Sequence, residues 1–271
     1  MYMKILLIIT VLSWNLLAEE SGKLKVNIGT MLITNFSTQM QISPHRSPIS
    51  ILIDTKENLG IDYQTGVFRI DGEYRFTQTH SIDFSYYSVK SDGSKSVQKE
   101  FTWGDTTIGS GAAVRSYFNM DIYKVNYGYS FYHNDKVELM LTAGLHITTV
   151  ALGLAATGNV RDENGTLVAG VYSESTSGTL PLPVFGFKGE YSISKNLFAN
   201  YRSEYFALKF DKYKGSYISN SISFEYKFAT HYGFGFGYNA NRLYVEGKGE
   251  NANFEVENTL SGFIVNLSYT Y

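Results

Sequence analysis

The sequence contains no cysteine, so neither disulfide bonds nor thiolate-ligated metals can hold its fold together. Proline is scarce, with 4 residues in 271, which favours many uninterrupted strands. The 23 Lys and Arg residues nearly balance 25 Asp and Glu residues, so the chain lacks the basic field of a nucleic-acid-binding protein. These absences exclude a disulfide scaffold and argue against nucleic acid as a partner.

Long apolar runs are also missing, because after the first twenty residues no window offers the ~18 apolar residues that a transmembrane helix needs. The N-terminal segment has one lysine, Lys4, an apolar run over residues 5–12, and Ala18 just before two glutamates. This order is typical of a secretory signal peptide. We therefore predict a signal peptide over residues 1–18, cleaved near Ala18 after Sec-type export, and a single domain over residues 19–271.

Aromatic residues and glycine are abundant, with 22 Tyr, 18 Phe and 25 Gly against 2 Trp, and this composition favours strands. Apolar residues alternate with polar ones in four successive hairpins. Their short turns fall at residues 77–80, 133–136, 194–196 and 229–231. Much longer polar stretches lie between the hairpins, at about 36–65, 90–117 and 156–178. With one strand before and one after the hairpins, we predict about ten strands.

The strand number stays open to 8 or 12, because residues 97–108 could pair within the second long loop. Residues 51–62 in the first long loop could cover a barrel mouth or extend a strand. Short turns that alternate with long loops are typical of a transmembrane antiparallel up-and-down β-barrel, with periplasmic turns and extracellular loops. We predict this all-β fold, although a soluble β-sandwich would show the same alternation.

One face of the predicted strands is apolar and nearly free of charge, with aromatic residues crowded beside the short turns. Such aromatics fit the girdle that a barrel places at a membrane interface. The opposite face carries seven basic and seven acidic residues, which a barrel would enclose in its lumen. These residues are Lys25, Arg69, Asp71, Glu73, Arg75, Asp83, Lys124, Glu138, Lys188, Glu190, Arg202, Glu204, Glu225 and Lys227.

This balance favours an internal salt-bridge network, because unpaired charges are costly in a narrow interior. Balance could also follow simply from the near-neutral composition of the chain. A barrel of about ten strands is little wider than one filled by its own side chains, so we favour a narrow or closed lumen over a general porin.

The chain ends in FIVNLSYTY, in which apolar or aromatic side chains occupy alternate positions. The alternating residues are Phe263, Val265, Leu267, Tyr269 and Tyr271. This segment resembles the C-terminal sorting signature of Gram-negative outer-membrane β-barrel proteins. The whole organisation looks most like the small barrels grouped with outer-membrane proteins A and W. The resemblance implies an outer-membrane location, assembly by the barrel-assembly machinery, and contact with outer-membrane lipids and lipopolysaccharide.

Catalytic groups are few. His80, His133 and His231 lie in or beside short turns, His45 lies in the first long loop, and His146 alone falls inside a strand on the inward face. Some barrels of this kind are lipid hydrolases or omptin proteases that use a histidine. No nucleophile or orienting group can be assigned to His146 from the sequence.

We therefore predict a non-enzymatic barrel with a surface or structural role, or one that passes small solutes. The alternative is an outer-membrane hydrolase or protease that uses a histidine such as His146. We expect no cofactor and no metal site. The Asn164-Gly165 pair, beside Asp162 and Glu163, predicts a type I′ hairpin turn rather than a calcium site.

Overall fold

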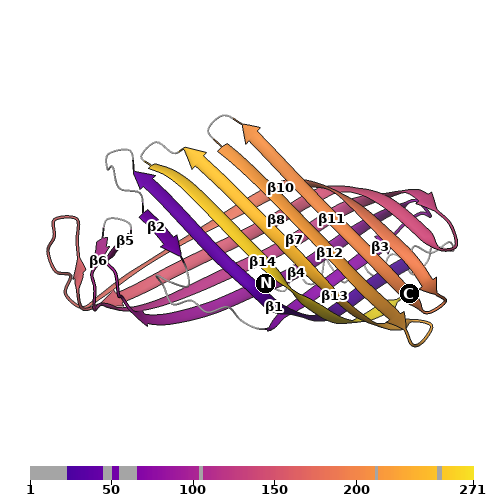
Figure 1. The fold of residues 1–271 in the computed structure, drawn as a ribbon, viewed down its shortest axis with the longest axis horizontal. Helices are drawn as coiled ribbons and strands as arrows, with labels where there is room; N and C mark the ends of the chain where they lie inside the picture. The colour runs from indigo at the N-terminus through magenta and orange to yellow at the C-terminus, as the bar shows by residue number, and fades with distance from the viewer. Residues whose placement is uncertain (1–22, 45–50, 55–65, 104–105, 211–212, 249–251) are drawn as a thin grey trace, which may run out of the picture.

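The computed structural model describes most of the chain (Figure 1). The described residues are 23–44, 51–54, 66–103, 106–210, 213–248 and 252–271. The predicted signal peptide over residues 1–18 and His45 lie outside them. In the part of the chain that the structure describes, no helix is long and apolar enough to cross a membrane.

The described residues form fourteen strands. In chain order these are β1 (Lys23–Pro44), β2 (Ile51–Asp54), β3 (Gly66–Arg75), β4 (His80–Ser96), β5 (Phe101–Trp103), β6 (Thr106–Ile108), β7 (Ala113–His133), β8 (Val137–Thr157), β9 (Val160–Arg161), β10 (Val171–Ser194), β11 (Leu197–Phe210), β12 (Tyr213–Lys227), β13 (Tyr232–Lys248) and β14 (Ala252–Thr270).

Ten of these strands close into an antiparallel barrel. Around the wall the order is β1, β3, β4, β7, β8, β10, β11, β12, β13 and β14, and β14 pairs again with β1. Closure leaves no sheet edge along the paired wall, as a structure surrounded by lipid requires. The predicted all-β barrel is confirmed, and the strand number is ten.

The structure also bears on the two open alternatives for the loops. Residues 51–54 form β2, which pairs with β1 and extends the sheet; residues 55–62 lie outside the described part. Strands β5 and β6 pair within the second loop and join β9 in a separate three-stranded sheet. The extra hairpin therefore adds no strand to the barrel. The sheet lies beside the loop ends of β7 and β8 (Figure 1).

The short connections fall where the sequence predicted them, and they meet at one rim of the barrel, which we call the turn end. The opposite rim, the loop end, differs from prediction because the strands there are longer. β7, β8 and β10 have 21, 21 and 24 residues, whereas a tilted strand needs about 9–11 to cross a bilayer. Residues 90–96, 113–117 and 171–178, predicted as loops, are strand. Their many serines and threonines fit a solvated strand as well as a loop.

The outer surface of the turn-end half is a belt of exposed apolar side chains. Phe185 is 68% exposed, Phe68 is 59% exposed and Val125 is 53% exposed. All three lie on the face that the sequence predicted to be apolar. Leu267 and Tyr271 of the C-terminal segment belong to the same belt. A soluble β-sandwich would bury this face, so the exposure of these apolar side chains favours a transmembrane barrel.

The lumen differs from the prediction in its loop-end half, where a large cluster of buried apolar side chains takes the place of the predicted charges. We call this cluster the apolar plug. Its members are Met31, Ile33, Phe36, Val67, Tyr87, Val89, Val97, Phe101, Trp103, Ile108, Ala112, Val114, Phe118, Met120, Ile122, Leu152, Leu154, Ala156, Val160, Leu260 and Ile264. The rings of Phe36 from β1 and Phe118 from β7 meet edge to face, 5.3 Å apart.

The plug includes residues of β5, β6 and β9, so the small loop sheet packs into the barrel interior. Side chains from strands that are not neighbours touch in the interior there, because the Phe36–Phe118 contact spans two intervening strands, β3 and β4. The loop-end lumen is thus filled by the chain itself. The charges predicted for the whole lumen occupy only its turn-end half.

Candidate functional site in the turn-end cavity

The turn-end half of the lumen contains a cavity of about 1180 Å³. Thirteen of the fourteen charged residues predicted for the lumen line it, and the fourteenth, Glu204, pairs with Lys124 at its inner end. Alternate residues of each strand face the cavity because side chains alternate across a strand. On β3, for example, Arg69, Asp71 and Glu73 succeed one another at every second position. The local period thus places these charges on one surface.

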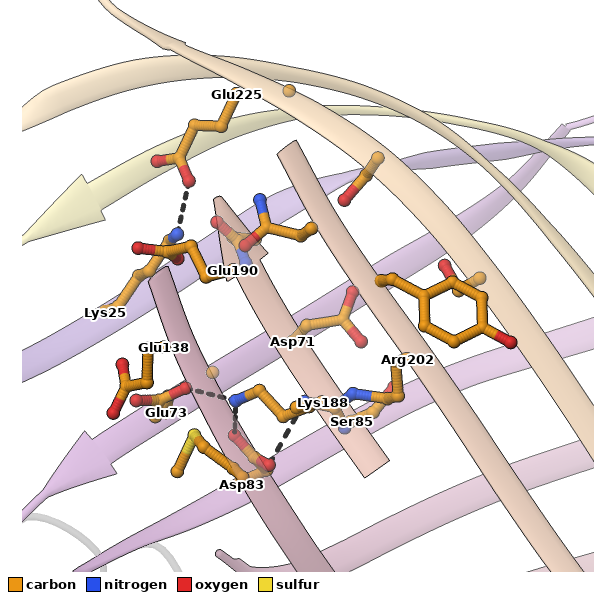
Figure 2. A pocket seen from close by; sticks show the side chains of 18 of the residues that line it. Lys25, Asp71, Glu73, Asp83, Ser85, Glu138, Lys188, Glu190, Arg202 and Glu225 are labelled. Carbon is orange, nitrogen blue, oxygen red and sulfur yellow. Dashed lines mark hydrogen bonds and ion pairs between the residues drawn. The ribbon is translucent and has the colours of Figure 1, made fainter. Parts of the chain in front are cut away.

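Arg75 begins a connected series of ion pairs near the turn end. Its guanidinium donates to both carboxylate oxygens of Glu138, at 2.6 and 2.9 Å, and to Glu73 at 3.1 Å. Lys188 of β10 then continues the series. Its Nζ binds Glu73 of β3 and donates to Asp83 Oδ1 at 2.9 Å. Figure 2 shows Lys188 reaching both carboxylates. Because β3 and β10 lie nearly opposite in the strand order, this pair crosses the lumen.

The series continues toward the apolar plug through β11. Arg202 lies 3.1 Å from Asp83 and 3.7 Å from Glu204. Glu204 accepts from Lys124 Nζ at 2.6 Å and from Asn126 Nδ2 at 3.1 Å. Lys124 and Glu204 are 6% and 1% exposed, so their charges are neutralised by each other and not by water. Eight alternating charges thus connect the rim of the cavity with its inner end.

Two further ion pairs lie beside this series. Arg69 donates to both oxygens of Asp71, at 2.7 and 2.8 Å. Lys25 from β1 binds Glu225 from β12, and Ser268 donates to the other oxygen of Glu225 at 2.7 Å. The Lys25 pair spans two intervening strands, and Figure 2 shows it across the cavity from Lys188. Ion pairs between strands that are not neighbours therefore tie this half of the barrel together.

Two of the fourteen charges have no ion-pair partner among the described residues. Lys227 Nζ lies over the ring of Phe198, 4.8 Å from its centroid. Glu190 faces the cavity near the Lys25–Glu225 pair (Figure 2). The cavity lining holds eight Lys and Arg residues against six Asp and Glu residues, so it carries a small positive excess.

Glycines make room for this polar packing. An added Cβ at Gly235 would lie 2.4 Å from Asn266 Oδ1, and one at Gly233 would lie 2.5 Å from Ser268 Oγ. Both positions belong to the GFGFG segment of β13. The segment packs against lumen side chains and lies within a strand, which a phosphate-binding turn would not do.

His146 lies beyond the inner end of the cavity and is only 2% exposed. Its Nε2 is 2.8 Å from Thr148 Oγ1, and its ring packs on Tyr217 at 4.3 Å. Its Nδ1 has no hydrogen-bond partner in the described part of the chain. An activated hydroxyl needs a histidine that a third group orients and that substrate can reach. His146 meets neither condition in this structure.

The other described histidines lie at the turn end. His80 packs among Phe76, Tyr127 and Tyr129, and His231 Nδ1 donates to the backbone carbonyl of Thr270 at 2.8 Å. None of these rings lies near the loop-end surface.

The side chain of Asp162 accepts hydrogen bonds within its own turn. Its Oδ1 accepts from the backbone N–H groups of Asn164 and Thr166, at 3.0 and 2.8 Å. The backbone N–H of Gly165 donates to the Asp162 carbonyl at 3.0 Å, so Glu163 and Asn164 are the central turn residues. The predicted turn exists, but Asn164-Gly165 is not its central pair, and the type I′ assignment was wrong.

Sequence reasoning missed the apolar plug, although the sequence carries a signal for it. On β4 the apolar residues keep one parity through Tyr86 and then change parity at Tyr87 and Val89. On β7 the same change falls between Ile122 and Tyr123. At this level of the wall, the apolar side chains change from the outer face of the strand to the inner face.

No protein-family model matches the chain, and no curated protein matches it. Among solved structures, the chain is similar to the outer membrane protease OmpT from Escherichia coli. The TM-score is 0.59 at 11% identity, with 92% of this chain and 97% of OmpT covered. Ail of Yersinia pestis matches with a TM-score of 0.34 at 11% identity, over 92% and 99% of the two chains. The toluene transporter TodX of P. putida gives 0.34 at 8% identity, over 94% and 91%. The likeness to OmpT shows that the fold is that of an outer-membrane β-barrel.

Proposed function

We propose that this chain, with the fold of an outer-membrane β-barrel, is a non-enzymatic protein of a Gram-negative outer membrane whose lumen is sealed against solute flow. Its role is structural, and its long strands present a surface beyond the membrane. Export by a cleaved signal peptide, assembly by the barrel-assembly machinery, and contact with lipid and lipopolysaccharide belong to the same proposal.

The apolar plug is the observation that carries the proposal. Phe118, Leu152 and Leu260 are at most 2% exposed, so water does not reach the centre of the loop-end lumen. An ion entering from the turn-end cavity would meet this dry packing, in which an unpaired charge is strongly disfavoured. The cross-lumen ion pairs narrow the path further below the plug.

The absence of a catalytic arrangement in the described residues supports a non-enzymatic role. The carboxylates of the connected series each have a cationic partner, which favours their role as fixed counter-ions. His146 is buried away from the cavity, and the other described histidines lie at the turn end. OmpT shares the fold, and a fold alone does not carry an activity.

Planar-bilayer recording of the refolded chain over residues 19–271 tests the proposal, with heat-modifiable gel mobility as the control for folding. We expect a folded barrel without discrete openings. A matched pair of variants sharpens the test: Phe118→Ser, which wets the plug, and Phe131→Ser, which changes an exposed phenylalanine of the same strand. Phe118→Ser should produce openings and Phe131→Ser should not. Discrete openings of the unaltered chain would overturn the proposal.

A further inference from the structure

One edge of β10 has no neighbouring strand along its loop-end half. The ladder between β10 and β8 runs without a break from Tyr191 to Val171. The ladder between β10 and β11 covers only the turn-end half and stops at the pair of Phe185 and Tyr205. Among the described residues, no other strand pairs with β10. In Figure 1 the loop ends of β8 and β10 lie to the left, whereas the β11–β12 hairpin rises at the top.

The backbone groups of every second residue point to this unpaired edge. Ser192 donates its backbone N–H to the Lys136 carbonyl at 2.7 Å, so the even-numbered residues of β10 face β8. In an antiparallel ladder, the next residue directs both its N–H and its C=O to the opposite edge. Because the register has no shift between Tyr191 and Val171, the odd-numbered residues keep that direction. Beyond Phe185, their donors and acceptors therefore face no strand of the described part.

Two prolines divide the unpaired edge. Pro181 and Pro183 are odd-numbered, so the edge has no donor at either position. Beside them the barrel is closed by side chains, because Leu182 of β10 packs with Phe206 of β11 in a buried apolar cluster. Farther toward the loop end, residues 171–179 keep an N–H at each odd position. We call residues 171–179 the free edge.

The free edge is accessible from both faces of the strand. Every residue from Ser173 to Thr179 is exposed, and a Cβ added at Gly178 would have nothing within 4 Å. The stretch lies on the loop-end side of Pro183, which pairs with the exposed belt residue Leu145. Another strand can therefore approach the free edge outside the belt without displacing packed side chains.

The chemistry of the free edge specifies its partner. A row of unpaired N–H and C=O groups is a template for one more strand, which it binds through main-chain hydrogen bonds. The side chains from Ser173 to Thr179 are polar or absent, and Glu174 is the only charged residue among them. Tyr172 Oη donates to the Glu174 carboxylate. Because opposite charges on paired strands attract, a basic residue beside Glu174 is favoured in the added strand.

A second copy of the chain in the same membrane does not fit this edge. Two such barrels would be related by a two-fold axis along the membrane normal. Because barrel strands tilt by about 35–45° from that direction, the two free edges would cross at about 70–90°. Neighbouring strands of a sheet differ in direction by only about 20–25°, so the two edges would form no ladder. The occupant is therefore a strand of a different molecule.

We infer that the free edge binds an extended, polar and basic segment of another polypeptide outside the membrane, which adds a strand beside β10. This inference rests on the surface role proposed above and names the class of partner for that surface. Each odd-numbered residue of the free edge supplies a donor and an acceptor to the added strand. Because Ser173 to Thr179 include no large apolar side chain, main-chain hydrogen bonds and the charge of Glu174 carry the binding.

Peptide binding to the refolded chain over residues 19–271, in micelles of a zwitterionic detergent, tests this inference. The probe is a short fluorescein-labelled peptide of alternating threonine and lysine, and fluorescence anisotropy measures its binding. One control is the same peptide N-methylated at every backbone amide, which cannot donate. The other control has glutamate in place of lysine. We expect the lysine peptide to bind, the N-methylated copy not to bind and the glutamate peptide to bind more weakly.

Variants of the chain locate the binding on β10. Ser175→Pro removes a donor from the free edge and leaves the ladder to β8 intact, because Ser175 is odd-numbered. It should weaken binding about tenfold, whereas Ser175→Thr, which keeps the N–H, should leave binding unchanged. Glu174→Lys should reverse the preference between the lysine and glutamate peptides. Heat-modifiable gel mobility verifies the folding of each variant, and if Ser175→Pro does not fold, Glu174→Lys and the N-methylated peptide decide.

Each contrary outcome has a distinct meaning. Equal binding of the N-methylated and parent peptides overturns the inference, and so does equal binding by the Ser175→Pro and Ser175→Thr variants. Self-association of the chain that Ser175→Pro abolishes, without peptide binding, would assign the edge to a second copy and also overturn it. A folded, non-conducting chain that binds no peptide overturns the inference and leaves the sealed barrel of the proposed function intact. A conducting chain that binds the peptide at β10 would contradict the sealed lumen and support the free edge.

Discussion

The two halves of the lumen are filled by side chains of opposite character. At the turn end, charged side chains pair across the interior and leave a cavity of about 1180 Å³. At the loop end, apolar side chains and a small loop sheet pack together in the interior. The outer surface follows the reverse order, because the apolar belt surrounds the charged half. Each level of the wall thus has one apolar and one polar face.

The surroundings of the outer surface determine which side chains fill the lumen at each level. Where the outside faces lipid, period-two alternation assigns the polar parity to the interior. Where the wall rises beyond the belt, the outside is polar and the interior becomes an ordinary hydrophobic core. Ion pairs therefore replace hydrophobic packing only where the outer surface has taken the apolar residues. Four substitutions test the two halves against each other.

The largest loss of stability is expected at the buried Lys124–Glu204 ion pair of the turn-end half. Glu204→Ala leaves Lys124 buried without its counter-ion, which should lower the free energy of unfolding by about 3–5 kcal/mol. Urea unfolding in lipid vesicles, followed by fluorescence and gel mobility, measures it. The double variant Lys124→Met with Glu204→Leu removes both charges and should recover most of the stability. A loss as large as that of Glu204→Ala in the double variant would mean that packing, not charge, matters there.

The loop-end half should respond to lost volume. Leu152→Ala opens a space in the plug and should lower the free energy of unfolding by roughly 3 kcal/mol, as large-to-small core changes do. Leu141→Ala on the same strand is the matched control, because Leu141 is 55% exposed on the belt. The same urea titration compares them. Equal losses at both positions would show that the plug is not a packed core.

An intermediate effect is expected from overfilling the turn-end half. Gly235→Ala places a Cβ 2.4 Å from Asn266 Oδ1 and should cost about 1–3 kcal/mol. Gly178→Ala in β10 is the control, because nothing lies within 4 Å of its added Cβ. Thermal gel-shift midpoints of the two variants measure the difference. If Gly235→Ala matched the control, the polar side chains around the cavity would have to be loosely held.

The smallest effect is expected at an exposed ion pair outside the lumen. Arg242 lies 2.8 Å from Glu257, with side-chain exposures of 61% and 35%. Arg242→Ala should change the free energy of unfolding by less than about 1 kcal/mol, and molar salt should abolish the difference. Urea titrations at low and high salt test this. The loss in Glu204→Ala should persist in salt, and a loss that disappeared would place the Lys124 pair in contact with bulk solvent.

Much of the fold was predictable because its signals are local. Period-two alternation in 80–86 and 123–131 marks strands and their apolar outer face, and polar residues at 194–196 and 229–231 mark turns. The fourteen lumen charges could be named for the same reason. Residues 171–178 could not be assigned to a strand, because their serines and threonines have no apolar partner face. Their strand state comes from pairing with β8.

The ion pairs between particular charged residues of the lumen were not predictable from the sequence. Arg75 pairs with Glu138 over 63 residues, and Lys188 pairs with Asp83 over 105 residues. Which of several inward carboxylates meets a given cation depends on strand tilt and register around a closed wall. The position of His146 behind the cavity, away from any access, depends on the same register.

The sequence by itself determined about ten antiparallel strands, each with one apolar face, because side-chain alternation and turn chemistry act over a few residues. Only the tertiary structure decided that the lumen is charged at one end and packed at the other, and which of its charges pair with one another. These features arise when strands distant in sequence come together at a given depth, since burial and ion pairing are properties of the closed barrel and not of any single strand.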